Sequence, residues 1–171
     1  MKKIKILTLL LCCLLSMSSC SQTLNKEDAK SRNKADSIIE KFLEKETKNR
    51  SYVLFSTTDE NYIIIIENTN SYNEFYIKDS KEIVPGNTYS KPNELLKKMF
   101  NKDIYQKEFI TFKSDFFMPD GYELSSGNIT YFVLKDENRN RYGEARLSVL
   151  IKPNPIDGEI YAYLVEKLLK Q

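Results

Sequence analysis

The segment from Ala35 to Leu43 carries apolar residues at the spacing of one helical face. They stand at positions i, i+3, i+4, i+7 and i+8: Ala35, Ile38, Ile39, Phe42 and Leu43. Charged residues, among them Glu40 and Lys41, occupy other positions of the same segment. An apolar stripe on an otherwise polar segment predicts an amphipathic helix, here one that ends near Lys48.

Six short segments rich in β-branched and aromatic residues predict strands, in two groups of three: residues 52–56, 62–66 and 74–78, then 108–113, 129–135 and 145–152. Residues 62–66 form an uninterrupted run between turn residues, which is typical of a central strand buried on both faces. In the last two segments, alternate residues are predicted to line one face: Ile129, Tyr131 and Val133 with Leu147, Val149 and Ile151.

Turn and capping residues separate these segments and start two more helices. Pro85-Gly86-Asn87 predicts a loop. Ser90, followed by Pro92, predicts the start of a helix whose apolar face is Leu95, Leu96, Met99 and Phe100. Asn154 and Pro155 predict the start of the last helix, with Asp157 near its positive end and a packing stripe of Ile160, Tyr163, Leu164 and Leu168.

The predicted order of elements is therefore helix, three strands, helix, three strands, helix. Strands joined by short turns favour an antiparallel sheet of about six strands with helices packed on one face, so the predicted fold class is α+β. We expect a single domain over residues 34–171. Residues 20–33 are polar and are predicted to form a tether, whose end is expected to begin the helix.

The first twenty residues form a targeting segment. Lys2, Lys3 and Lys5 precede an apolar run over residues 6–15, which contains a single polar residue, Thr8. This run has the length of the apolar core of a signal peptide and is shorter than the roughly 20 residues that span a bilayer. Ser16-Met17-Ser18-Ser19-Cys20 follows, with small residues at the two positions before the cysteine.

This stretch resembles the lipobox of bacterial lipoproteins, in which an aliphatic residue and two small residues precede a cysteine; Met17 stands where that family usually has Leu. The resemblance covers residues 1–20 only. It implies that residues 1–19 are removed, that Cys20 is lipidated, and that the protein is anchored to a membrane of the bacterial cell envelope, periplasmic or surface-facing. The alternative is an ordinary secretory signal cleaved near Ser19, which leaves Cys20 as a thiol.

Composition limits the chemistry and the partners of the mature chain. Of 26 basic residues, three lie in residues 1–19, so 23 remain against 24 acidic residues, and the net charge of −1 gives no argument for nucleic-acid binding. The chain has no histidine, which excludes His-based acid–base, nucleophilic and metal chemistry. We therefore predict no enzyme, no cofactor and no metal site.

Four groups of residues are candidates for binding or chemistry. The predicted hairpin tip 136–143 places Arg139, Arg141 and Tyr142 where they would recognise a carboxylate or phosphate; the alternative is a solvated turn. Aromatic residues of the C-terminal half would line a pocket or simply belong to the core: Tyr122, Tyr131, Tyr142, Tyr161, Tyr163, Phe116, Phe117 and Phe132. The weaker candidates are a cation site at Asp115, Asp120 and Glu123, and a carboxylate pair among Glu67, Glu74, Glu108 and Asp115.

The predicted function is a non-enzymatic binding or accessory module, anchored to the membrane by lipid, with an envelope protein or a small ligand as its partner. One alternative is an inhibitor or immunity-type lipoprotein that blocks an enzyme acting on the envelope. The second alternative is a carboxylate-dependent hydrolase.

Overall fold

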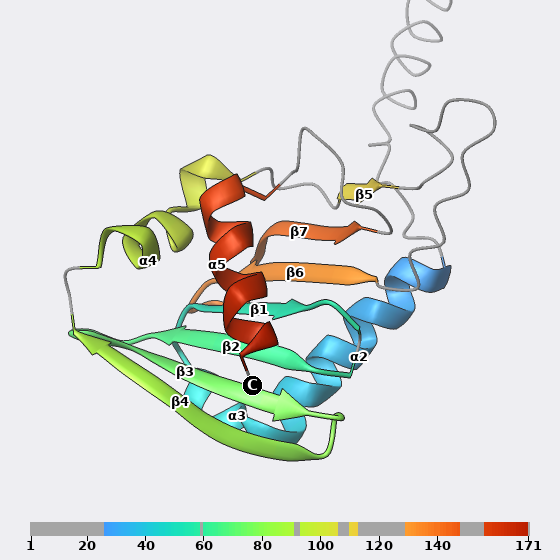
Figure 1. Ribbon diagram of the computed structural model, residues 1–171, viewed down its shortest axis with the longest axis horizontal. Helices are drawn as coiled ribbons and strands as arrows, with labels where there is room; N and C mark the ends of the chain where they lie inside the picture. Colours follow the sequence, from blue (N-terminus) through green and yellow to red (C-terminus); the bar gives the residue numbers. More distant parts are fainter. Residues whose placement is uncertain are drawn as a thin grey trace, which may run out of the picture.

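The computed structural model describes residues 26–58, 60–90, 93–105, 110–112, 129–147 and 156–170 (Figure 1). Its helices are α2 (Lys26–Phe42), α3 (Glu44–Thr47), α4 (Glu94–Met99), the short 3₁₀ helix η1 (Lys102–Ile104) and α5 (Gly158–Leu169). Its strands are β1 (Tyr52–Ser56), β2 (Tyr62–Glu67), β3 (Ser71–Lys78), β4 (Glu82–Ser90), β5 (Ile110–Phe112), β6 (Thr130–Lys135) and β7 (Arg141–Leu147).

These strands form one sheet in the order β4-β3-β2-β1-β6-β7-β5. The strands from β4 to β7 in this order pair antiparallel with their neighbours, and β5 lies parallel to β7 at one edge. The predicted α+β class and antiparallel sheet of about six strands are therefore confirmed. Four strands, rather than the predicted three, precede α4.

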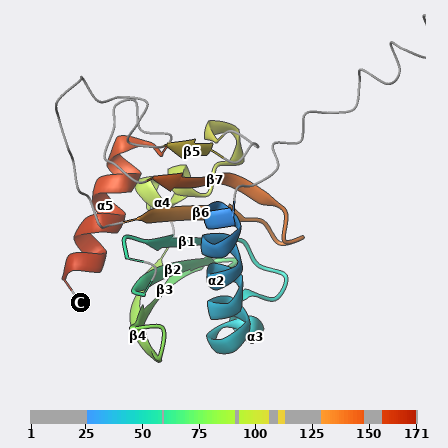
Figure 2. The same ribbon diagram turned by 90° about the vertical axis from the view of Figure 1, so that its right-hand side faces the viewer.

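Helices cover both faces of the sheet, so the prediction that they lie on one face was wrong. Figures 1 and 2 show α2 and α3 on one face and α4 and α5 on the other. Successive residues of β1 and β2 are buried on alternate sides: Val53 and Ile63 pack with α4 and α5, whereas Leu54 and Ile64 pack with α2. A strand that is apolar on both sides requires a cover on each side.

The prediction that residues 62–66 form a central strand is confirmed. Ile63, Ile64 and Ile65 have no exposed surface, and β2 lies between β1 and β3. Burying an isoleucine side chain is worth about 1.5–3 kcal/mol, so these three side chains together contribute several kcal/mol of hydrophobic stabilisation.

The first helix begins earlier than the hydrophobic pattern predicted. Residues 26–33, assigned to the tether, form the first two turns of α2, so they belong to the folded domain. Asp28 and Ser31 are buried in these turns against Arg146 of β7. The pattern missed them because these turns are held by polar contacts rather than by an apolar stripe.

The predicted loop Pro85-Gly86-Asn87 is instead part of β4. Proline is tolerated there because β4 is the edge strand, and no strand of the described sheet needs an N–H donor on its outer side. Gly86 and Asn87 together lie opposite Glu74 of β3, which is a β-bulge.

In both α4 and α5 the capping residue is a different one from the predicted residue and lies closer to the helix. The side chain of Asn93, rather than Ser90, caps α4 by accepting a hydrogen bond from the backbone N–H of Leu96 at 3.0 Å. Asp157 caps α5 by accepting from Glu159 and Ile160 at 3.1 and 3.3 Å. The predicted cap Asn154 and the following Pro155 lie outside the described residues.

A second β-bulge, in β7, decides which side chains face α2. Ala145 pairs with Phe132 and Tyr142 with Leu134, so Gly143 and Glu144 together lie opposite a single residue of β6. Gly143 has a φ of +57°, a left-handed value that favours glycine.

The register of β6 against β7 also contradicts the prediction that alternate residues of the last two strands line one face of the sheet. Leu147 lies opposite Thr130 and packs with the α5 side, whereas Tyr131 and Val133 pack with α2, so they do not line one face. Val149 and Ile151 lie outside the described residues.

Replacing Gly143 with alanine should lower the free energy of unfolding by at least about 2 kcal/mol, since an L-residue is strained at this φ. A Cβ there would lie 2.4 Å from the ring of Tyr105, which would have to move. Gly158→Ala is the matched control, because its Cβ would meet no atom within 4 Å. Urea denaturation of both variants measures the effect, and equal midpoints would contradict this account of the bulge.

Candidate functional site

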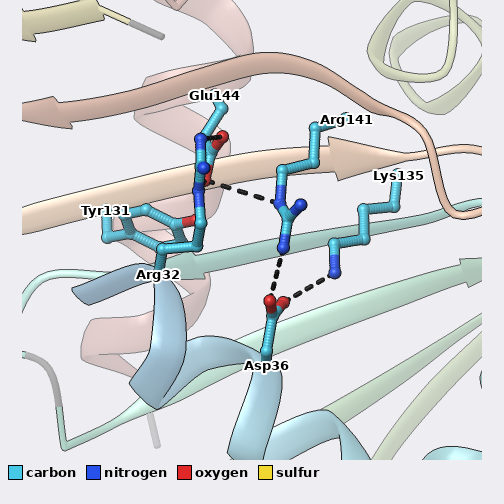
Figure 3. Close-up of polar contacts among 6 residues, drawn as sticks. All are labelled: Arg32, Asp36, Tyr131, Lys135, Arg141 and Glu144. Atoms are coloured by element: carbon cyan, nitrogen blue, oxygen red, sulfur yellow. Dashed lines mark hydrogen bonds and ion pairs between the residues drawn. The ribbon is translucent and has the colours of Figure 1, made fainter. Parts of the chain in front are cut away.

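Three ion pairs join α2 to β7 and form what we call the ion-pair ladder. Its rungs are Asp28–Arg146, Arg32–Glu144 and Asp36–Arg141. The Arg146 guanidinium lies 3.6 Å from Asp28, and Arg32 Nε donates to Glu144 Oε1 at 2.7 Å. Figure 3 shows the second and third rungs, with their side chains directed toward one another across the space between helix and sheet.

The spacing of the ladder follows from backbone geometry. On the helix the rungs are four residues apart, which advances about 6 Å, and two residues of a strand advance about 6.7 Å. The bulge at Gly143 supplies the extra residue that brings Arg141, rather than Tyr142, to the α2 face. Charges at i, i+4 and i+8 of α2 therefore meet opposite charges on β7.

Glu144 is the most enclosed member of the ladder, with 4% of its side chain exposed. It accepts hydrogen bonds from Arg32 and from the hydroxyl of Tyr131, and Arg141 Nε lies 3.7 Å away. Burial raises the pKa of Tyr131, and the neighbouring carboxylate raises it further, so this hydroxyl remains a donor. Burial acts to lower the pKa of Arg32, but the hydrogen bond and charge of Glu144 outweigh it and raise the pKa.

Asp36 joins the ladder to β6, because its carboxylate is shared by two cations. Lys135 Nζ donates to Asp36 Oδ1 at 2.6 Å, and Arg141 binds the other oxygen (Figure 3). Both cations are thereby held in place at the end of the sheet where β6 turns into β7.

A charged cleft of about 240 Å³ opens beside Asp36. Three cationic side chains line it from the β6–β7 side, Lys135, Arg139 and Arg141, and three carboxylates line it from the helices, Asp36, Glu40 and Glu44. Tyr52 also lines the cleft. Burial raises the pKa of Tyr52, Asp36 raises it further, and Arg141 and Arg139 partly oppose the shift.

The structure separates the three residues predicted to form a partner-binding tip. Arg139 and Arg141 line the charged cleft, whereas Tyr142 packs on the other face of the sheet, with Lys102 Nζ 5.3 Å from its ring. Arg141 and Tyr142 are consecutive residues of β7 and therefore lie on opposite faces, and the bulge decides that Arg141 is the one that faces α2. Sequence reasoning missed Asp36, Glu40 and Lys135; the acidic residues at i and i+4 of the predicted helix were the available signal.

The turn that carries Arg139 is held by Asp136. Its carboxylate accepts from the backbone N–H groups of Asn138 and Asn140 at 2.9 and 2.8 Å, and Lys102 Nζ lies 3.4 Å away. Burial acts to raise the pKa of Asp136, but these hydrogen bonds, with that from the Asn140 amide, lower it.

Glu74 forms a second buried charged group, on the α5 face. Its side chain has no exposed surface and accepts hydrogen bonds from the hydroxyls of Tyr163 at 2.8 Å and Tyr76 at 3.0 Å. Lys167 Nζ lies 3.2 Å from Glu74 Oε1. Because Tyr163 and Lys167 belong to α5, this group fastens that helix to the sheet.

The other predicted candidates lie in several places. Glu67 ends β2 and lines a separate polar pocket with Glu137, and Tyr131 and Phe132 are buried within the sheet. Tyr161 packs edge-on against Phe55 with ring centres 5.8 Å apart. The remaining predicted residues lie outside the described residues: Cys20, Glu108, Asp115, Phe116, Phe117, Asp120, Tyr122 and Glu123.

Within the described ranges, no group of three or more His, Cys, Asp or Glu residues is placed to hold a metal ion. No helix in the same part of the chain is long and apolar enough to cross a membrane.

Comparison with known proteins identifies no relative. A scan against protein-family models finds no match, and searches of the curated proteins and of the solved structures find no similar chain.

Proposed function

We propose that the protein is a bacterial envelope lipoprotein, anchored through Cys20, whose α+β domain is a non-enzymatic binding module. The observation that carries the proposal is the lipobox-like sequence Ser16-Met17-Ser18-Ser19-Cys20 directly after a ten-residue apolar run. Acyl chains contribute about 0.8 kcal/mol per buried methylene, so two or more chains on Cys20 hold a protein stably at a bilayer.

The number of residues between Cys20 and α2 limits how far an anchored domain could lie from the membrane. α2 begins at Lys26, and six residue steps span at most about 20 Å in any conformation. An anchored domain would therefore lie close to the membrane, with the first turn of α2 nearest to the anchor. Glu40 lies about 20 Å further along the helix axis, so the charged cleft would open at the end of α2 remote from the anchor.

The charged cleft supports a binding role for the domain. It brings Arg139 and Arg141, two of the three residues predicted to recognise a partner, together with Lys135. Guanidinium groups bind carboxylates and phosphates through paired hydrogen bonds, and Arg141 is already positioned by Asp36.

Replacing Cys20 with serine should move the protein from the membrane fraction to the soluble fraction, because serine lacks the sulfur that receives the lipid. Fractionation of cells, with mass spectrometry of the mature N-terminus, measures this. Cys12→Ser is the matched control, since Cys12 lies within the apolar run and its replacement should leave anchoring unchanged. Retention of the Cys20→Ser protein in the membrane fraction, or an unmodified Cys20 thiol in the original protein, would contradict the proposal.

A further inference from the structure

The ion-pair ladder has a fourth rung that is open. Four residues beyond Asp36, α2 carries Glu40, and two residues before Arg141 the turn carries Arg139. Both residues line the charged cleft. Neither side chain forms an ion pair or hydrogen bond with another residue in the part of the chain that the structure describes. The fourth rung therefore places opposite charges on the two walls of a cleft without joining them.

We propose that this open rung binds a zwitterionic ligand, one with a carboxylate and an ammonium group such as an amino acid or a short peptide. Its carboxylate contacts Arg139, and its ammonium group contacts Glu40. The ligand thus bridges Glu40 and Arg139, which form no direct ion pair with each other. This inference rests on the proposed binding function and names the ligand class of the same domain.

The charges that line the cleft favour a ligand with one positive and one negative group over a ligand with a single charge. On the sheet side, Lys135 and Arg141 share the single carboxylate of Asp36, and Arg139 adds a third cation. On the helix side, Glu40 and Glu44 are exposed, one helical turn apart in sequence. An anion alone would leave the two glutamates uncompensated, and a cation alone would leave Arg139 uncompensated. A zwitterion satisfies both walls.

Lys135, Arg141 and the backbone turn that carries Arg139 are held in place before a ligand arrives, which lowers the entropic cost of binding. Lys135 and Arg141 are held by Asp36. Arg139 sits on the turn fixed by Asp136, with a φ of +64° and its backbone N–H bonded to the Asp136 carbonyl at 2.9 Å. The cleft volume of about 240 Å³ corresponds to roughly eight water molecules, which suits a ligand of amino-acid or dipeptide size.

Isothermal titration of the full chain in detergent, with three matched probes, tests the inference. The probes are glycylglycine, which carries both charges, N-acetylglycylglycine, which has only the carboxylate, and glycylglycinamide, which has only the ammonium group. We expect glycylglycine to bind at least tenfold more tightly than either capped probe. Arg139→Gln and Glu40→Gln should each weaken its binding at least tenfold, whereas Lys97→Gln, at an exposed position of α4 on the opposite face of the sheet, should not.

Equal binding of the capped probes, unchanged binding by both variants, or no binding of glycylglycine would each overturn the inference. The Cys20 fractionation is a separate readout, because it depends on the N-terminal segment and not on the cleft. A chain that is lipidated but does not bind glycylglycine overturns the ligand class and leaves the anchor intact. Both variants alter exposed side chains, so thermal unfolding should show that they remain folded.

Discussion

Replacing Glu144 with alanine should lower the free energy of unfolding by about 3 kcal/mol, which is the lower end of the range for breaking a buried ion pair. The carboxylate is nearly enclosed, and its loss removes a buried acceptor from both Arg32 and the Tyr131 hydroxyl. The lower end applies because Arg32 and Arg141 retain 25% and 32% exposure, so water compensates part of the loss.

Urea denaturation monitored by circular dichroism measures this effect. Glu144→Gln should cost less, because an amide oxygen still accepts from Tyr131 while the charge is lost. Glu166→Ala is the matched control, since Glu166 is exposed and its ion pair within the described residues is with Lys170, one helical turn away; such a pair is worth about 0.5 kcal/mol or less. A loss below about 1 kcal/mol for Glu144→Ala would show that the ladder is not a structural support of α2.

The two residues of a rung, Arg32 and Glu144, should also be energetically coupled. In a double-mutant cycle, Arg32→Ala together with Glu144→Ala should cost less than the two single losses added, because each single variant leaves a charge without its partner. Additive losses would contradict the contact that joins these two residues.

Replacing Glu74, whose side chain has no exposed surface, with alanine should lower the free energy of unfolding by about 3–5 kcal/mol, the range found when one partner of a buried ion pair is removed. The change leaves two tyrosine hydroxyls and the Lys167 ammonium facing a cavity. Since Tyr163 and Lys167 belong to α5, we also expect this helix to lose amide-exchange protection before the central strands do.

The matched test replaces both charged partners by apolar residues of similar length. Glu74→Met with Lys167→Met should recover most of the stability lost in Glu74→Ala, because no uncompensated charge remains in the core. Glu159→Ala, at an exposed position of the same helix, should change the unfolding midpoint little. A fully stable Glu74→Ala protein would contradict the role of Glu74 in fastening α5.

Glu74 and Glu144 each lie beside a β-bulge that contains a glycine, and the bulges explain which helix each carboxylate faces. Gly86 lies opposite Glu74, where a Cβ would come within 2.8 Å of the Glu74 Cβ. Gly143 is adjacent to Glu144. An extra residue in one strand changes which side chains face which helix, and glycine permits both the close approach at Gly86 and the positive φ at Gly143.

Local patterns in the sequence were sufficient to predict the helices and strands in which buried residues recur at a regular spacing. The amphipathic segment of α2, the central strand β2 and the apolar stripe of α5 were all predicted, because each buries a continuous row of apolar side chains. The strand β4 was not predicted, because Pro85 and Gly86 are turn residues in most contexts and only the position of β4 at the sheet edge makes them acceptable.

The amino-acid sequence by itself determined the fold class, and it predicted an N-terminal targeting segment and the binding role of the two arginines that line the charged cleft. The tertiary structure decided which residues meet them. Arg32 and Glu144 are 112 residues apart in the chain, and Asp36 and Arg141 are 105 apart. The spacing of residues along the chain does not predict such pairs. They form only because the bulge at Gly143 determines which residues of β7 face α2, and because α2 packs across that face.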